Sequence, residues 1–137
     1  MLGHRGARDV YSENTLPGFK HALEMGLQRI ECDVHLTSDK QIVVIHDFTL
    51  ERTTNGKGRV DTITYEDLSK LDAGNGTKVP LLEELLTLLL QYPKRILHIE
   101  IKDIEAGIPA LLMVQRMGAL EQVLFISFHH PILQTVS

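Results

Sequence analysis

The stretch RIECDVHL, residues 29–36, decides the fold, because apolar and polar side chains alternate along it. Successive side chains of a β-strand point to opposite faces, so Ile30 and Val34 share one face while Glu31 and Asp33 share the other. An apolar face packs against helices, and charged side chains on the opposite face must point into an interior or toward a site at its rim. The stretch therefore predicts a strand with one packing face and one acidic face.

The same pattern returns in ILHIEIK, residues 96–102, which places Glu100 and Lys102 on the polar face of a second strand. A short apolar segment, residues 2–4, precedes the His4-Arg5-Gly6-Ala7 turn. Apolar residues at helical spacing predict helices that begin near Thr15, Pro80 and Ile108, and apolar runs predict further strands at residues 42–45 and 123–128. Strands that alternate with helices indicate an α/β fold with a parallel sheet.

Two connections do not fit a simple strand-helix repeat. The link from Val34 to Ile42 is too short for a helical crossover between parallel strands, which takes a dozen or more residues. It must be a hairpin or an irregular connection, and the pattern does not decide between them. Residues 47–79 are rich in Thr, Asn, Gly and Asp, with one short helical signal at 64–71. This stretch is predicted to be a long surface insertion, of the kind that is usually functional or mobile.

Composition narrows the class of protein. The chain has 137 residues and is expected to form one domain, residues 1–137. Its formal net charge is −4, and it contains no basic run or stripe, so no nucleic-acid partner is expected. The single cysteine, Cys32, is predicted to be a small core residue, and it fits a reducing compartment. No signal-peptide pattern or long apolar run occurs, so we expect a cytoplasmic protein without stable membrane insertion.

Three carboxylates, Glu31, Asp33 and Glu100, fall near the C-terminal ends of their strands. These strand ends are where α/β barrels carry their active sites. Carboxylates gathered there would repel one another and raise their own pKa values unless a cation were present. Oxygen ligands favour Mg²⁺, Ca²⁺ or Mn²⁺ over zinc. The alternative is that they are separate surface charges, or that Glu100 pairs with Lys102.

Four further side chains are candidates for chemistry on an ester or phosphate. His4 and His46 follow predicted strands, and histidine has the side chain whose ordinary pKa suits proton transfer near neutral pH. A lone histidine at a strand end is more often a structural residue held by hydrogen bonds. Arg5 could bind a phosphate through its planar fork and Lys102 as a point charge.

Eight short segments, taken in order, resemble the glycerophosphodiester phosphodiesterases. They are HRG at 4–6, ENT at 13–15, IECDV at 30–34, VVIHD at 43–47, RTT at 52–54, LDAG at 71–74, PLLEE at 80–84 and IEIK at 99–102. Each fragment is weak by itself, but their order and spacing extend over most of the chain. The resemblance is therefore specific.

The resemblance implies a TIM-type (β/α) barrel with a family insertion, residues 47–79, after the third strand. It also implies roles for the residues already isolated: Glu31, Asp33 and Glu100 as ligands of a Mg²⁺, Ca²⁺ or Mn²⁺ ion, His4 and His46 as the general acid and base, and Arg5 and Lys102 as phosphate-binding residues. The implied reaction is metal-dependent hydrolysis of a small glycerophosphodiester to glycerol 3-phosphate and an alcohol such as choline or ethanolamine.

Length sets the remaining expectations. A complete barrel of this kind takes about 250 residues, and the chain carries patterns for about five of its eight strands. We therefore expect a partial barrel, truncated at its C-terminus, whose exposed edges favour self-association. One alternative is an inactive fragment that only binds phosphate or associates with itself. Another is a related phospholipase-type phosphodiesterase, which a hydrophobic ridge at the barrel mouth would favour.

Overall fold

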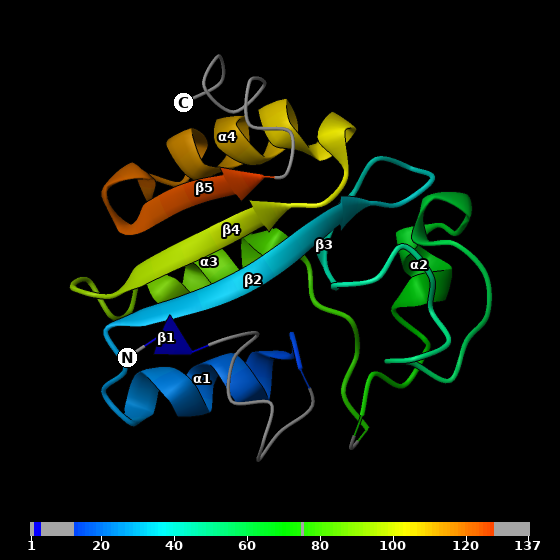
Figure 1. The fold of residues 1–137 in the computed structure, drawn as a ribbon, viewed down its shortest axis with the longest axis horizontal. Helices are drawn as coiled ribbons and strands as arrows, with labels where there is room; N and C mark the ends of the chain where they lie inside the picture. Colours follow the sequence, from blue (N-terminus) through cyan, green and yellow to red (C-terminus); the bar gives the residue numbers. More distant parts are fainter. Residues whose placement is uncertain (1, 4–12, 75, 128–137) are drawn as a thin grey trace.

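Strand β2 (Arg29–Leu36) lies at the centre of a five-stranded sheet (Figure 1). The computed structural model describes residues 2–3, 13–74 and 76–127. β2 pairs in parallel with β1 (Leu2–Gly3) and with β4 (Ile96–Ile101), and β4 pairs in parallel with β5 (Val123–Ser127). The order β1-β2-β4-β5 confirms the parallel α/β sheet that the alternating patterns predicted.

Strand β3 (Ile42–Val44) is the exception, because it runs antiparallel to β2. The hairpin places Val44 opposite Val34, and its turn needs a left-handed residue, Lys40, at φ 64°. Of the two connections left open by the sequence, the hairpin is therefore present. Five strands occur within the described residues, as expected, but only four of them lie in the parallel path. The hairpin also turns the chain back, so that the Ile45 N–H donates to the main-chain oxygen of Asp33 at 3.0 Å.

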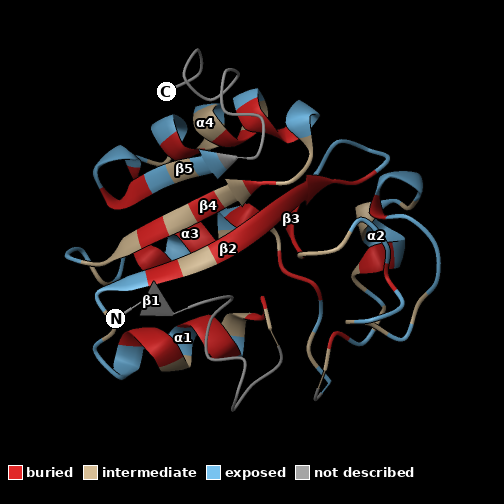
Figure 2. Ribbon diagram, viewed as in Figure 1, coloured by how far each residue is buried: buried red, intermediate tan, exposed pale blue. Residues whose placement is uncertain are grey.

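Three helices cover the apolar face of the sheet: α1 (Leu16–Glu24), α3 (Leu82–Leu89) and α4 (Gly107–Arg116). Their buried residues, which are red in Figure 2, belong with those of β2 and β4 to one hydrophobic core. Cys32 is fully buried in this core, as predicted. None of the helices within the described residues has the length and hydropathy that crossing a bilayer requires.

Helix α3 shows how the sequence builds this layer. All four residues of its predicted apolar stripe are fully buried: Leu82, Leu85, Leu86 and Leu89. Burying a leucine side chain stabilises a fold by about 1.5–3 kcal/mol. The first turn is capped by Glu84, whose Oε1 accepts from the Leu81 N–H at 2.9 Å. Packing and capping therefore agree on where this helix begins.

Residues 47–79 have a core of their own. They contain the short helices η1 (Val60–Thr62) and α2 (Tyr65–Leu68), and α2 lies within the stretch 64–71 where a helix was predicted, with the Thr64 side chain as its cap. Apolar side chains of this segment pack against Val43 of β3 and against Ile45, which follows β3. Together they form a second hydrophobic cluster: Val43, Ile45, Leu50, Val60, Leu68, Ala73 and Val79. Two further short helices, η2 (Ile104–Ala106) and η3 (Leu120–Gln122), precede α4 and β5. The segment after β3 is thus held against the sheet, and its polar residues have defined positions.

Candidate active site

The three candidate metal ligands lie together on the polar face of the sheet. Asp33 of β2 is paired in register with Glu100 of β4, and Glu31 lies two residues earlier on the same face of β2. One carboxylate oxygen from each residue lies within 4.8 Å of the other two. Asp33 is fully buried, and the other two are partly buried. The structure therefore brings together the three residues that the strand pattern singled out.

Electrostatics in this cluster favour a cation. Burial and, after it, the contact with Glu100 together raise the pKa of Asp33 to about 7, against the opposing effect of a hydrogen bond from Asn14. The donated bond runs from Asn14 Nδ2 to Asp33 Oδ2 over 3.2 Å. A carboxyl group that resists ionisation because of burial and like charge becomes an anion readily once a positive ion is beside it. An all-carboxylate donor set suits Mg²⁺, Ca²⁺ or Mn²⁺.

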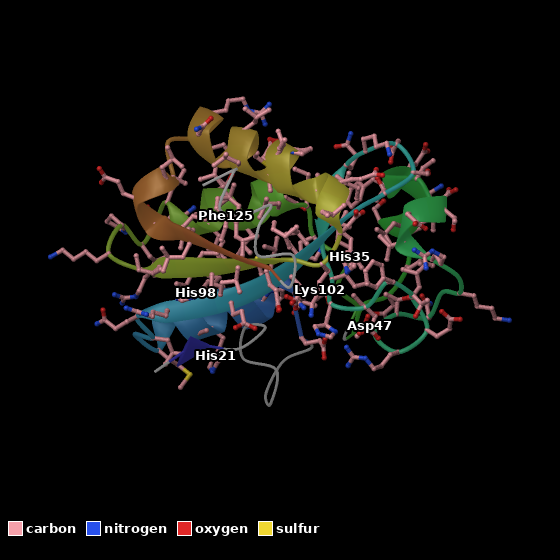
Figure 3. All side chains as sticks on the ribbon, turned by 45° about the horizontal axis from the view of Figure 1, so that its top comes forward. His21, His35, Asp47, His98, Lys102 and Phe125 are labelled. Atoms are coloured by element: carbon pink, nitrogen blue, oxygen red, sulfur yellow. The ribbon has the colours of Figure 1, made fainter. Side chains whose placement is uncertain are left out.

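Lys102 lies at the edge of the same cluster. Its Nζ is 3.6 Å from Glu100 Oε1, and only 12% of its side chain is exposed. The Glu100–Lys102 pair that the sequence offered as an alternative is thus present alongside the carboxylate cluster. Figure 3 shows Lys102 near His35 and Asp47 at one end of the sheet, whereas His98 and His21 lie toward the other end. Lys102 is placed where it can attract an anion that approaches the carboxylates.

His46 follows β3, and its ring is held by its neighbour Asp47. Nδ1 of His46 lies 2.8 Å from Asp47 Oδ1, and about a quarter of the His46 side chain is exposed. The guanidinium of Arg52 holds the pKa of Asp47 well below its usual range. An ionised carboxylate only accepts hydrogen bonds, so Nδ1 carries the proton and Nε2 is left to exchange one. This is the arrangement that a general acid or base needs.

His35 supports His46 through the main chain. It is buried on the polar face of β2, and its Nε2 lies 2.9 Å from the main-chain oxygen of His46. Burial lowers the pKa of His35, and a carbonyl oxygen can only accept, so the neutral ring donates from Nε2. The sequence left His35 without a chemical role, and the structure gives it a structural one.

Four residues with clear positions in the site were quoted in short motifs but received no role from the sequence. They are Glu13, Asn14, Asp47 and Arg52. Asn14 lines a small cavity together with His46 and also contacts Asp33, so it lies between the candidate base and the carboxylates. Two features of the sequence pointed to them: the ENT segment, residues 13–15, lies at the start of a predicted helix, and Asp47 directly follows His46. Neither signal reveals a partner that is distant along the chain.

Two predicted site residues, His4 and Arg5, lie outside the described residues. The structure therefore places one residue of each predicted pair. These are His46 of the proton-transfer pair and Lys102 of the phosphate-binding pair. The roles of all four residues stay predictions.

Comparison with known proteins gives one consistent result. The profile of the glycerophosphoryl diester phosphodiesterase family matches residues 4–135. A glycerophosphodiester phosphodiesterase of Bacillus altitudinis is 39% identical over an alignment of 142 positions, gaps included, which covers 95% of this chain and 58% of that protein. The chain therefore spans about three fifths of this relative's length.

Solved structures of phosphodiesterases are also similar to this chain. A glycerophosphodiester phosphodiesterase from Agrobacterium tumefaciens is 32% identical with a TM-score of 0.90, over 98% of this chain and 62% of that one. An Oleispira antarctica phosphodiesterase, solved in complex with its product sn-glycerol-3-phosphate, is 28% identical with a TM-score of 0.84, over 98% of this chain and 59% of that one. The likeness extends over nearly all of the present chain and over part of each neighbour.

Proposed function

The chain belongs to the glycerophosphoryl diester phosphodiesterase family, and from this premise we propose that it hydrolyses glycerophosphodiesters to glycerol 3-phosphate and an alcohol in a metal-dependent reaction. Its fold is part of a TIM-type (β/α) barrel, with the site at the C-terminal ends of the strands. The observation that carries the proposal is the convergence of Glu31, Asp33 and Glu100 on one point of that rim.

The three carboxylates would hold a Mg²⁺, Ca²⁺ or Mn²⁺ ion, which their oxygen donors and the raised pKa of Asp33 support. When bound, such an ion neutralises charge on phosphoryl oxygens. Lys102 lies beside the carboxylates, so it would hold a phosphate oxygen through its ammonium group, with Arg5 as the second phosphate-binding residue. These contacts would orient the phosphodiester with its scissile bond toward His46.

Proton transfer is assigned to His46 and His4. In this hydrolysis, one histidine takes a proton from the attacking water as the water oxygen bonds to phosphorus. The other gives a proton to the alcohol oxygen as the bond from phosphorus to that oxygen breaks. If the glycerol hydroxyl attacks instead, the first product is a cyclic phosphate, which a water molecule must then open to give glycerol 3-phosphate. His46 would act through Nε2, because its Nδ1 is engaged by Asp47. Which step each histidine serves follows from the side on which the alcohol leaves.

Two wider assignments belong to the same proposal. We assign residues 47–79 to the family insertion, since this segment packs as a unit over β3. We also place the protein in the cytoplasm, a location supported by the free thiol of Cys32. The physiological substrate would then be a small water-soluble glycerophosphodiester.

The exposed apolar residues of β5 suit contact with another copy of this chain. Leu124 and Ile126 of β5 face the same side as Glu100 and are 50% and 40% exposed. Exposed apolar side chains beside a sheet edge favour contact with another chain. We propose that β5 is the contact surface between copies.

The test is release of glycerol 3-phosphate from glycerophosphocholine by the purified 137-residue chain, with Mg²⁺, Ca²⁺ or Mn²⁺ and then with excess chelator. We expect release that requires the ion, and activity per chain that rises with protein concentration as copies associate. Glu83→Gln, which changes a carboxylate on α3 away from the cluster, serves as the control and should match the wild type. A folded, ion-loaded chain that releases no product at any concentration would contradict the proposal for this chain.

A further inference from the structure

The side chain of Arg52 joins two parts of the candidate site that are far apart in the sequence. Its Nε and Nη2 donate to Asp47 Oδ2 and Oδ1 at 2.8 and 2.9 Å. Its Nη1 and Nη2 also donate to Glu13 Oε1 and Oε2, each at 2.9 Å. Arg52 thus grips two carboxylates with both edges of its guanidinium. We call the connected series Glu13–Arg52–Asp47–His46 the Arg52 bridge.

One end of the Arg52 bridge determines the orientation of Asp47. That carboxylate receives two bonds from Arg52, so its plane is fixed, and its Oδ1 meets His46 Nδ1 at 2.8 Å. A planar bidentate grip of this kind fixes direction as well as distance. The partner of one ring nitrogen determines which nitrogen of a histidine carries the proton. Arg52 therefore acts on His46 without touching it.

The other end of the Arg52 bridge reaches the segment before α1. Glu13 is 39 residues away from Arg52 along the chain and is only 12% exposed. The next residue, Asn14, has a left-handed backbone at φ 55°, which asparagine tolerates better than most residues. This backbone allows the buried Asn14 amide to donate to Asp33. The bridge thus ties the segment that contacts the carboxylates to the segment that carries His46.

We propose that Arg52 is a positioning residue for the reaction: it holds Asp47 so that His46 keeps its proton on Nδ1 and presents Nε2 to the substrate. The proposal rests on the proposed function only where it gives His46 a role in proton transfer. Arg52 is about half exposed, whereas its partners Glu13 and Asp47 are only 12% and 24% exposed. Solvent therefore weakens these ion pairs only in part, so Arg52→Ala should lower stability as well as alter the geometry of the site, whereas Arg52→Lys keeps a positive charge beside both carboxylates.

The chain contains a matched control for this arginine. Arg59 lies in the same segment, is 54% exposed, and grips Asp61 with two bonds of 3.0 Å, from Nε and Nη2. Neither Arg59 nor Asp61 has a described hydrogen bond to His46 or Asp47, and Arg59 reaches the His46 main chain only indirectly, through its contact with Phe48 and the packing of Phe48 on His35. Arg59→Ala therefore removes a similar exposed arginine-carboxylate pair while leaving the Arg52 bridge intact.

The test compares Arg52→Ala, Arg52→Lys and Arg59→Ala by ¹⁵N NMR of the histidine rings and by steady-state kinetics. We expect wild type and Arg59→Ala to show neutral His46 protonated on Nδ1, and Arg52→Ala to show a mixture that includes the Nε2-protonated form. Arg52→Lys keeps the charge but lacks the fork, so it should restore the Nδ1 form only in part. In Arg52→Ala, kcat should fall by about 10–100-fold with a smaller change in KM, as misplacement of a catalytic group predicts.

The two readouts separate this proposal from the proposed function. If His46 in folded Arg52→Ala and Arg52→Lys keeps its proton on Nδ1 as in the wild type, the positioning role is wrong, whatever the activity. If the tautomer changes as expected but the wild type releases no glycerol 3-phosphate, the positioning role stands and the proposed function fails. Arg52→Lys decides the first question if the alanine variant does not fold.

Discussion

Alanine in place of His46 is expected to lower kcat for glycerophosphocholine hydrolysis by about 10²–10⁴-fold, the range that a general acid or base contributes. The reason is that His46 Nε2 is left free to exchange a proton while Nδ1 is held by Asp47. KM should change little, since the phosphate is assigned to Lys102 and Arg5. Steady-state kinetics at saturating metal ion measure both constants.

His21→Ala is the control for that substitution. His21 lies in the last turn of α1, toward the opposite end of the sheet from Asp47 and Lys102 (Figure 3). It should keep wild-type kcat. A folded His46→Ala protein with full turnover would remove His46 from the proton-transfer pair, and equal losses in both variants would point to a general structural effect instead.

Asparagine in place of Asp33 is expected to change two measurements in opposite directions. Ion affinity, measured by calorimetry, should fall by at least about 10–100-fold, because the buried ligand loses its charge; product release should fall with it. The metal-free protein, by contrast, should become more stable at pH 8. Neutral asparagine avoids the cost of ionising a buried carboxyl beside Glu100.

The raised pKa of Asp33 predicts the direction in which the stability of the metal-free protein changes with pH. The pKa of Asp33 is about 7 in the fold, against about 3.8 for the ordinary group, so the folded state holds this proton more tightly. The free energy of unfolding of the metal-free wild type should then fall as pH rises from about 4 to 7, by at most about 1.4 kcal/mol per pH unit from this group. A saturating ion should restore stability most strongly near pH 8, where it meets the ionised carboxylate.

Urea unfolding of wild type and Asp33→Asn at pH 5 and pH 8, each with and without the ion, measures these effects. The exposed Asp67 of α2 offers the control, Asp67→Asn, which should keep both the ion affinity and the wild-type pH response. The contradicting result concerns the free energy of unfolding without the ion. If it rises from pH 5 to pH 8 by the same amount in the wild type and in Asp33→Asn, the assigned environment of Asp33 is wrong.

Local patterns were enough to predict most of the fold. Strand alternation in residues 29–36 and 96–101 predicted both which face packs and which face is acidic, because side-chain direction in a strand depends only on position. The leucine stripe of α3 was predicted for the same reason, from the period of the helix. Glu31, Asp33 and Glu100 were isolated by this argument and do lie together.

What the sequence could not predict depends on contacts between distant segments. The short link before β3 fitted a hairpin or an irregular connection, and only the pairing of Val34 with Val44 decides between them. The hairpin matters for the site, because it returns the chain to the level of Asp33 before His46. Arg52 and Glu13 were both quoted in motifs, yet their contact across 39 residues leaves no local pattern.

The most direct test of the central claim is a crystal structure of this chain grown with Mn²⁺, with the ion located by its anomalous scattering. The account predicts one strong peak between Glu31, Asp33 and Glu100, with an oxygen of each carboxylate at about 2.0–2.6 Å from the ion. A well-ordered crystal that shows Mn²⁺ bound elsewhere and no peak among these three carboxylates would contradict it.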